Sequence, residues 1–177
     1  MQRPPLQISS RGICLPVVHD SYRDGDTDVY RVAGGVWTIT YDAGSEDIVV
    51  AEFPGGLFRW AVRFLDCWTP EKRECGGMHA KAYLRSLVEK YADREQSIWI
   101  PKPEGEENAL AKMATFDRVL AYIFVSPRVT LNGLMVESGW AAETKPALQE
   151  LQASGHFERM VAEHPELAPP AKKKKRR

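Results

Sequence analysis

Three short segments of the chain carry side chains that together can do chemistry on a phosphodiester. The first is the acidic turn Asp24-Gly25-Asp26-Thr27, the second runs from Arg63 to Glu71, and the third begins at Arg118. A carboxylate that binds a divalent cation, a second carboxylate that acts on water and two guanidiniums are the groups that hydrolysis of such an ester needs. We therefore expect these segments, far apart in the chain, to converge on one pocket.

Each of these residues also has an ordinary structural explanation. Asp and Gly are favoured in β-turns for geometric reasons alone. Arg63 lies in the apolar run Trp60–Leu65, where a guanidinium must either face water or be paired. Pro70 ends that run, which places Glu71 on a loop at the sheet edge. Arg118 opens the apolar run 119–125, where a strand end can simply be solvated. The hypothesis of a site depends on these residues meeting in space.

The first half of the chain alternates β-prone runs with turns. Gly34-Gly35 between two such runs predicts a hairpin, and Pro54-Gly55-Gly56 separates two more. The β-prone runs are 13–18, 28–32, 36–41, 48–53 and 57–65.

The second half adds helices. Apolar residues at helical spacing predict a helix over 78–92, after the break at Gly76-Gly77. Strands are expected at 97–100 and 119–125, and helices at 132–140 and 146–163. Strands first, an inserted helix, another strand pair and then helices indicate an α+β fold, which a five-stranded barrel with a capping helix would satisfy.

Bulk composition fits one globular domain with charged ends. The 177 residues carry no net charge, but the last six are all basic, so the rest has 18 basic residues against 24 acidic ones, a net charge of about −6. We expect a flexible arm at 1–12, a domain over 13–165 and a disordered basic tail at 166–177. Three cysteines, no apolar leader and no run of eighteen apolar residues favour a cytoplasmic protein without a membrane span.

The segments resemble the staphylococcal-nuclease-like, or thermonuclease, family from about Val17 to Ala142. Asp24-Gly25-Asp26-Thr27 looks like its first metal loop, and Val62 to Glu71 looks like its arginine strand with the Thr-Pro-Glu turn. Gly77 with Ala80, Ala82 and Leu84 is similar to the start of its first helix. Asp117 to Tyr122 resembles its Arg-x-Leu-Ala-Tyr strand, and Leu131 to Ala141 resembles its Asn-x-x-Leu helix with the final glycine.

The resemblance implies an α+β fold built on a five-stranded OB-fold β-barrel with about three helices. The span between residues 28 and 62 is longer than in the family, which predicts an extra hairpin. It also implies a Ca²⁺-assisted nuclease acting on DNA or RNA, with Mg²⁺ or Mn²⁺ as alternatives. By position, the resemblance implies Asp26 and the Thr69 carbonyl as metal ligands, Glu71 as the general base, Arg63 and Arg118 as ligands of the phosphate, and Phe116 as a stacking partner of a nucleobase.

One residue departs from the family pattern at the metal. Trp68 stands where the family carries a second metal-binding aspartate, and an indole cannot bind Ca²⁺. Asp24 and Asp66 are the candidates to replace that ligand. Two functions therefore remain: a metal-dependent nuclease, or a non-catalytic module of the same fold that binds nucleic acid or protein. We expect a monomer whose partner is nucleic acid rather than a membrane.

Overall fold

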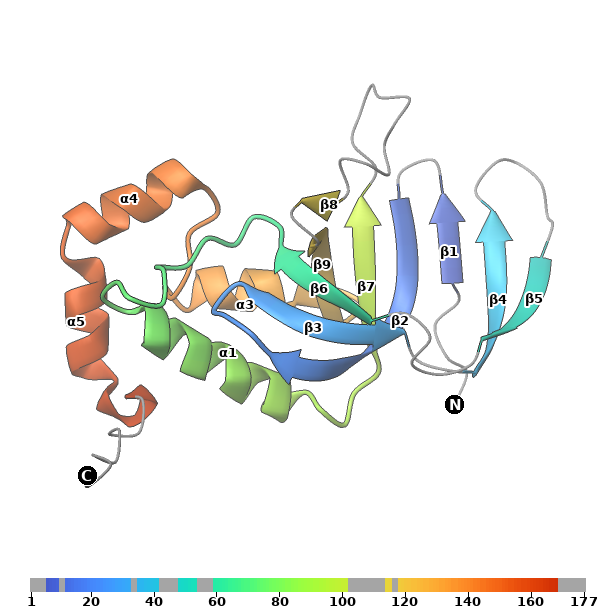
Figure 1. The fold of residues 1–177 in the computed structure, drawn as a ribbon, viewed down its shortest axis with the longest axis horizontal. Helices are drawn as coiled ribbons and strands as arrows, with labels where there is room; N and C mark the ends of the chain where they lie inside the picture. Colours follow the sequence, from blue (N-terminus) through green and yellow to red (C-terminus); the bar gives the residue numbers. More distant parts are fainter. Residues whose placement is uncertain are drawn as a thin grey trace, which may run out of the picture.

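A closed five-stranded barrel is the centre of the fold in the computed structural model (Figure 1). The structure describes residues 6–9, 12–32, 35–41, 48–53, 59–101, 114–115 and 118–168. The barrel strands are β2 (Gly12–Tyr22), β3 (Thr27–Val32), β6 (Arg59–Phe64), β9 (Arg118–Ser126) and β7 (Gln96–Pro101). They pair in that order, and β7 pairs with β2 to close the ring. The predicted α+β fold with an OB-fold-like barrel is thus confirmed.

One pairing in this ring is parallel and decides where the site forms. The strands β6 and β9 run in the same direction, with Arg63 opposite Leu120 and Ala61 opposite Arg118. The other four pairings of the ring are antiparallel. The start of β9 therefore lies beside the middle of β6, which brings the two arginine-bearing segments together.

The strand β2 is long enough to serve two partners along one edge. Its second half pairs with β3, and its beginning pairs with β1 (Leu6–Ser9). On its other side β1 pairs in parallel with β4 (Gly35–Tyr41), which forms an antiparallel hairpin with β5 (Ile48–Phe53). This hairpin is the predicted addition between residues 28 and 62, and it lies at the end of the molecule away from α4 and α5 (Figure 1).

Two local expectations differ from the structure in this region. The Gly34-Gly35 hairpin between 28–32 and 36–41 is wrong, because β3 lies between β2 and β6, whereas β4 lies between β1 and β5. β3 and β4 follow each other in sequence but are separated in the sheet by β2 and β1, because β2 pairs with the edge of β3 that a hairpin partner would occupy. Residues 6–9, placed in the N-terminal arm by the sequence, form β1.

Helices cover the barrel on one side. They are α1 (Gly77–Lys90), α3 (Leu131–Glu137), α4 (Lys145–Ala153) and α5 (His156–Glu163), followed by the 3₁₀ turn η1 (Pro165–Leu167). Two short strands, β8 (Ala114–Thr115) and β10 (Val129–Thr130), pair with β9. The single helix expected over 146–163 is two helices, because Gly155 adopts a left-handed φ of 69° between them. The fold thus has four described α-helices rather than about three.

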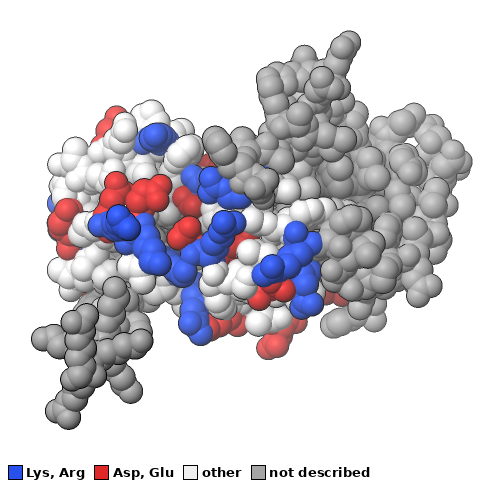
Figure 2. Space-filling model, in the orientation of Figure 1, with Lys and Arg blue, Asp and Glu red and all other residues white. Residues whose placement is uncertain are grey.

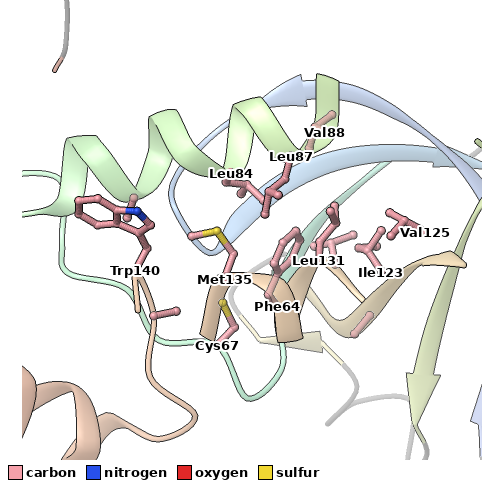
Figure 3. Packing of buried hydrophobic residues seen from close by; sticks show 14 of the residues in the cluster. Phe64, Cys67, Leu84, Leu87, Val88, Ile123, Val125, Leu131, Met135 and Trp140 are labelled. Carbon is pink, nitrogen blue, oxygen red and sulfur yellow. The ribbon is translucent and has the colours of Figure 1, made fainter. Parts of the chain in front are cut away.

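The core joins α1 and α3 to the barrel wall. Figure 3 shows Leu84, Leu87 and Val88 of α1 above Phe64 of β6 and Leu131 of α3. Trp140 and Met135 continue the cluster toward Cys67, whose side chain is fully buried. This packing fixes the ends of β6 and β9 and the start of α1, which are the elements that carry the predicted site. No helix in the described ranges is long and apolar enough to span a membrane.

Candidate functional site

One cleft gathers most of the residues that the sequence singled out. It has a volume of about 740 Å³ and lies where the loop between β2 and β3, the strands β6 and β9, the start of α1 and the helix α4 meet. The predicted residues Asp26, Arg63, Thr69, Glu71 and Arg118 all line it. Phe116, predicted to contact a base, falls outside the described residues. The convergence expected from three distant segments is therefore present for these five.

Close packing around a glycine positions the acidic loop. A Cβ on Gly25 would stand 2.9 Å from the Thr69 Oγ1 and 3.2 Å from the Ala80 Cβ, so the absence of a side chain lets the loop touch both the Thr-Pro-Glu turn and α1. The loop is closed by a 2.7 Å hydrogen bond from the Asp24 N–H to the Thr27 carbonyl. These contacts hold Asp26 over the end of β6.

A buried aspartate at the start of β3 stabilises the same loop. Asp28 is fully buried, accepts a 2.7 Å hydrogen bond from the Arg23 N–H and contacts His19 Nε2 at 3.2 Å. Burial raises the pKa of the Asp28 carboxyl, and the His19 and Arg23 contacts act in the opposite direction. Sequence reasoning missed this pair, because the role of Asp28 depends on β2 and β3 lying side by side.

Arg63 is held on one of its nitrogens. Nη1 forms an ion pair with the Asp26 carboxylate and donates to the carbonyls of Cys67, at 3.0 Å, and of Asp26, at 3.4 Å. In the described part of the chain, Nε and Nη2 have no hydrogen bond. Those two nitrogens form the fork with which arginine binds a phosphate in a bidentate manner. The guanidinium is thus oriented by the protein and still able to bind an anion.

The turn after β6 carries Trp68 into the cleft. Asp66 has a left-handed φ of 48°, and its carboxylate accepts a hydrogen bond from the Tyr122 hydroxyl on β9. Beyond it, Trp68 exchanges two backbone hydrogen bonds with Ala142, of 2.7 and 2.9 Å. The Arg63 guanidinium lies over the Trp68 ring, 4.7 Å from its centroid. The indole therefore occupies a fixed place beside Arg63.

A buried asparagine supports this turn from α3. The Asn132 side-chain oxygen accepts from the Ile123 N–H at 3.0 Å, and its amide nitrogen donates to the carbonyls of Leu65, at 2.8 Å, and Ala121, at 3.0 Å. The register of β6 and β9 ends at Phe64 and Ala121, and the Asn132 side chain provides an acceptor for the Ile123 N–H, which lies beyond that last pair. Asn132 belongs to the helix motif seen in the sequence, but its role there was not predicted.

Glu71 is exposed on the loop before α1, as its position after Pro70 predicted. Its N–H donates to Glu74 Oε2 at 2.7 Å, and its carbonyl accepts from the Glu74 N–H at 2.8 Å. A Cβ on Gly77 would stand 2.1 Å from the Glu71 carbonyl oxygen. The backbone is therefore tightly packed, while the Glu71 carboxylate, which has no partner among the described residues, remains available in the cleft.

Arg118 and three lysines complete the basic groups of the cleft. Within the described residues the Arg118 guanidinium has no ion pair, in contrast to Arg63. The lysines are Lys72, Lys81 on α1 and Lys145 on α4. Five basic and five acidic side chains line the cleft, so its charges are balanced, and the face seen in Figure 2 likewise mixes both signs. Any anion bound here is recognised by placement of charges rather than by a uniformly positive surface.

The donor set suits some cations better than others. Asp26 supplies one carboxylate next to Thr69, whose N–H approaches Asp26 Oδ2 at 3.4 Å. Among the described residues, no three His, Cys, Asp or Glu side chains are grouped to hold a metal. Asp24 and Asp66 line the cleft, but Asp66 is engaged by Tyr122. The residues therefore fit a cation that completes its shell with water and substrate phosphate, as Mg²⁺ does, better than a full cage of six to eight protein oxygens.

The fold and the cleft define the class of protein only as an OB-fold-like barrel with a polar cleft at the ends of β6 and β9. Comparison of the sequence with models of known protein families, and with curated proteins, found no match.

Proposed function

We propose that the protein is a divalent-metal-dependent nuclease that hydrolyses phosphodiester bonds in DNA or RNA within this cleft. The observation that carries the proposal is the meeting of Asp26, Arg63, Glu71 and Arg118 around one hollow. Each of the four also has a structural explanation, but two of them, Glu71 and Arg118, have no partner among the described residues. Because neither side chain is tied to another group in that part of the chain, both can contact a ligand that enters the cleft.

The residues divide the reaction between them. The free Nε and Nη2 of Arg63, with Arg118, hold the phosphate and offset the charge that develops on phosphorus. Glu71 accepts a proton from water, whose oxygen forms a bond to phosphorus as the bond to the leaving sugar oxygen breaks; that oxygen takes a proton from solvent. Asp26 and the Thr69 carbonyl would hold the cation, which, when bound, supplies a positive charge next to the phosphate.

Cleavage assays on the full chain test this proposal. Plasmid and RNA are incubated with Ca²⁺, Mg²⁺ or Mn²⁺ and with a chelator. We expect cleavage that needs a cation, and a loss of about a hundredfold or more in Glu71→Gln and in Arg118→Ala. The exposed residues Glu163 and Arg128 lie outside the cleft, so Glu163→Gln and Arg128→Ala are matched controls that keep wild-type activity. Full activity in both cleft variants would refute the assignment.

A second function is favoured by one specific observation. Asp26, the carboxylate proposed for the cation, is already ion-paired with Arg63, and Trp68 stands where a second carboxylate would be needed. A non-catalytic module that binds nucleic acid or protein through the same cleft has no need of either ligand. Binding of nucleic acid without cleavage under any of the cation conditions would select this function instead.

A further inference from the structure

Trp68 is unusual in being a large apolar side chain that faces the cleft. It is 37% exposed, and Val18 is the other large hydrophobic residue that stands exposed in the described part of the chain. The neighbours Cys67 and Thr69 are buried, so the turn points Trp68 outward while the residues on either side point inward. Figure 3 shows Cys67 directed into the core beside Met135. The exposure of the indole is therefore built into the turn.

The indole is also held in place before any ligand arrives. The two backbone hydrogen bonds to Ala142 fix its main chain, and the Arg63 guanidinium covers one face of its ring. The exposed surface accordingly lies on the rest of the ring, toward the cleft that it lines. A flat ligand can stack there without the loss of side-chain freedom that binding ordinarily costs.

The surroundings of Trp68 indicate which flat ligand fits. Arg63 and Arg118 lie in the same cleft, and both offer nitrogens without partners among the described residues. An aromatic ring beside guanidiniums is the combination that binds single-stranded nucleic acids, in which bases stack on the ring and cations follow the backbone. Because the cleft has as many acidic as basic side chains, general attraction for phosphate is weak, and stacking has to supply a share of the affinity.

We propose that Trp68 is the stacking platform for an unpaired base, and that the cleft therefore takes a single-stranded segment of DNA or RNA. In a duplex the face of a base is covered by its neighbours and is not available to an indole. The phosphate next to the stacked base reaches the fork of Arg63 and the guanidinium of Arg118. The inference rests on the proposed function in so far as the cleft binds a nucleic-acid backbone, but it does not require cleavage.

Binding to strands with and without bases tests the proposal. The probes are a fluorescent oligothymidylate of about 12 nucleotides, within the span of one OB-fold, its uridylate equivalent, an abasic strand of equal length and charge, and a duplex. Affinities are measured by anisotropy with a chelator, and with Mg²⁺ in the Glu71→Gln background. We expect Trp68→Ala to bind the base-carrying strands about 5- to 150-fold more weakly, which corresponds to 1–3 kcal/mol at 1.4 kcal/mol per factor of ten.

Three comparisons make the result decisive. Trp68→Phe keeps an aromatic face and should stay within about fivefold of the wild type, and Trp99→Ala, a half-buried residue of β7 outside the cleft, should bind as the wild type does. The abasic strand and the duplex should bind more weakly than the single strand and be indifferent to Trp68→Ala. An equal loss on the abasic strand, no loss on any strand, or a preference for duplex overturns this inference alone. Failure to bind any of the probes overturns it together with the proposed function.

Discussion

Asn132 offers the sharpest test of how the cleft is held together. Its side chain makes three hydrogen bonds to the backbone, and the residue is only 2% exposed. In Asn132→Ala the buried Ile123 N–H loses its partner, which costs about 1–3 kcal/mol. The hydrogen bond from the Asn132 amide to the Leu65 carbonyl is also lost, which costs about 1 kcal/mol. The Ala121 carbonyl, in contrast, still accepts from the Leu65 N–H at 3.0 Å. We therefore expect a total loss of about 2–4 kcal/mol in the free energy of unfolding.

Denaturant unfolding followed by circular dichroism measures this loss in free energy, and thermal unfolding measures the accompanying decrease in Tm. For a domain of this size each kcal/mol lowers Tm by about 2–4 °C, so the expected decrease in Tm is about 4–16 °C. Ser138→Ala is the matched control at the end of α3, because it removes one local hydrogen bond to Met135, of 2.9 Å, and should change stability by less than about 0.5 kcal/mol. An Asn132→Ala protein with wild-type unfolding would mean that the Asn132 side chain does not carry the junction of β6 and β9.

Two further predictions concern the turns around the cleft. Gly77→Ala would place a Cβ 2.1 Å from the Glu71 carbonyl oxygen, so we expect about 1–3 kcal/mol of destabilisation and, if the protein is a nuclease, loss of activity because Glu71 is displaced. The control is Gly133→Ala in α3, whose Cβ would lie 3.2 Å from a side-chain oxygen and which should change stability by about 1 kcal/mol at most. Equal destabilisation by the two substitutions would contradict the packing argument. Burial, together with the hydrogen bond to Asp66 and its charge, raises the pKa of Tyr122 to about 12 from 10.0, so its contribution to stability is complete below pH 10.0 and is lost as the pH rises toward 12. Burial also raises the pKa of Tyr30 and Tyr22, so ultraviolet titration should show one late-ionising tyrosine fewer in Tyr122→Phe than in the wild type. In Asp66→Asn one of the late ionisations should move to lower pH. The same titration curve in all three proteins would exclude the interaction.

The strand pattern of the site could be read from the sequence with little loss. Arg63 and Glu71 are eight positions apart across a strand end marked by Pro70, so their proximity follows from local rules. The helix over 78–92 was also predicted, because periodicity is a local signal. The addition between 28 and 62 was predicted differently, from a span longer than that of the family the sequence resembles. The Gly34-Gly35 hairpin was predicted from a local signal and was wrong. Two glycines indicate a turn, but they do not determine whether the strands before and after that turn pair with each other.

The sequence by itself determined which chemical groups are present and that short strands precede helices, since residue types and their spacing carry that information. The tertiary structure alone decided that β6 and β9 lie parallel, which brings Arg118 to the cleft of Arg63, and that α4 adds Lys145 as a wall. It also decided that Arg63 uses one nitrogen for Asp26 and keeps two free, and that Trp68 faces outward. Such features arise from contacts between segments far apart in the chain, and no local pattern encodes which distant neighbour a side chain meets.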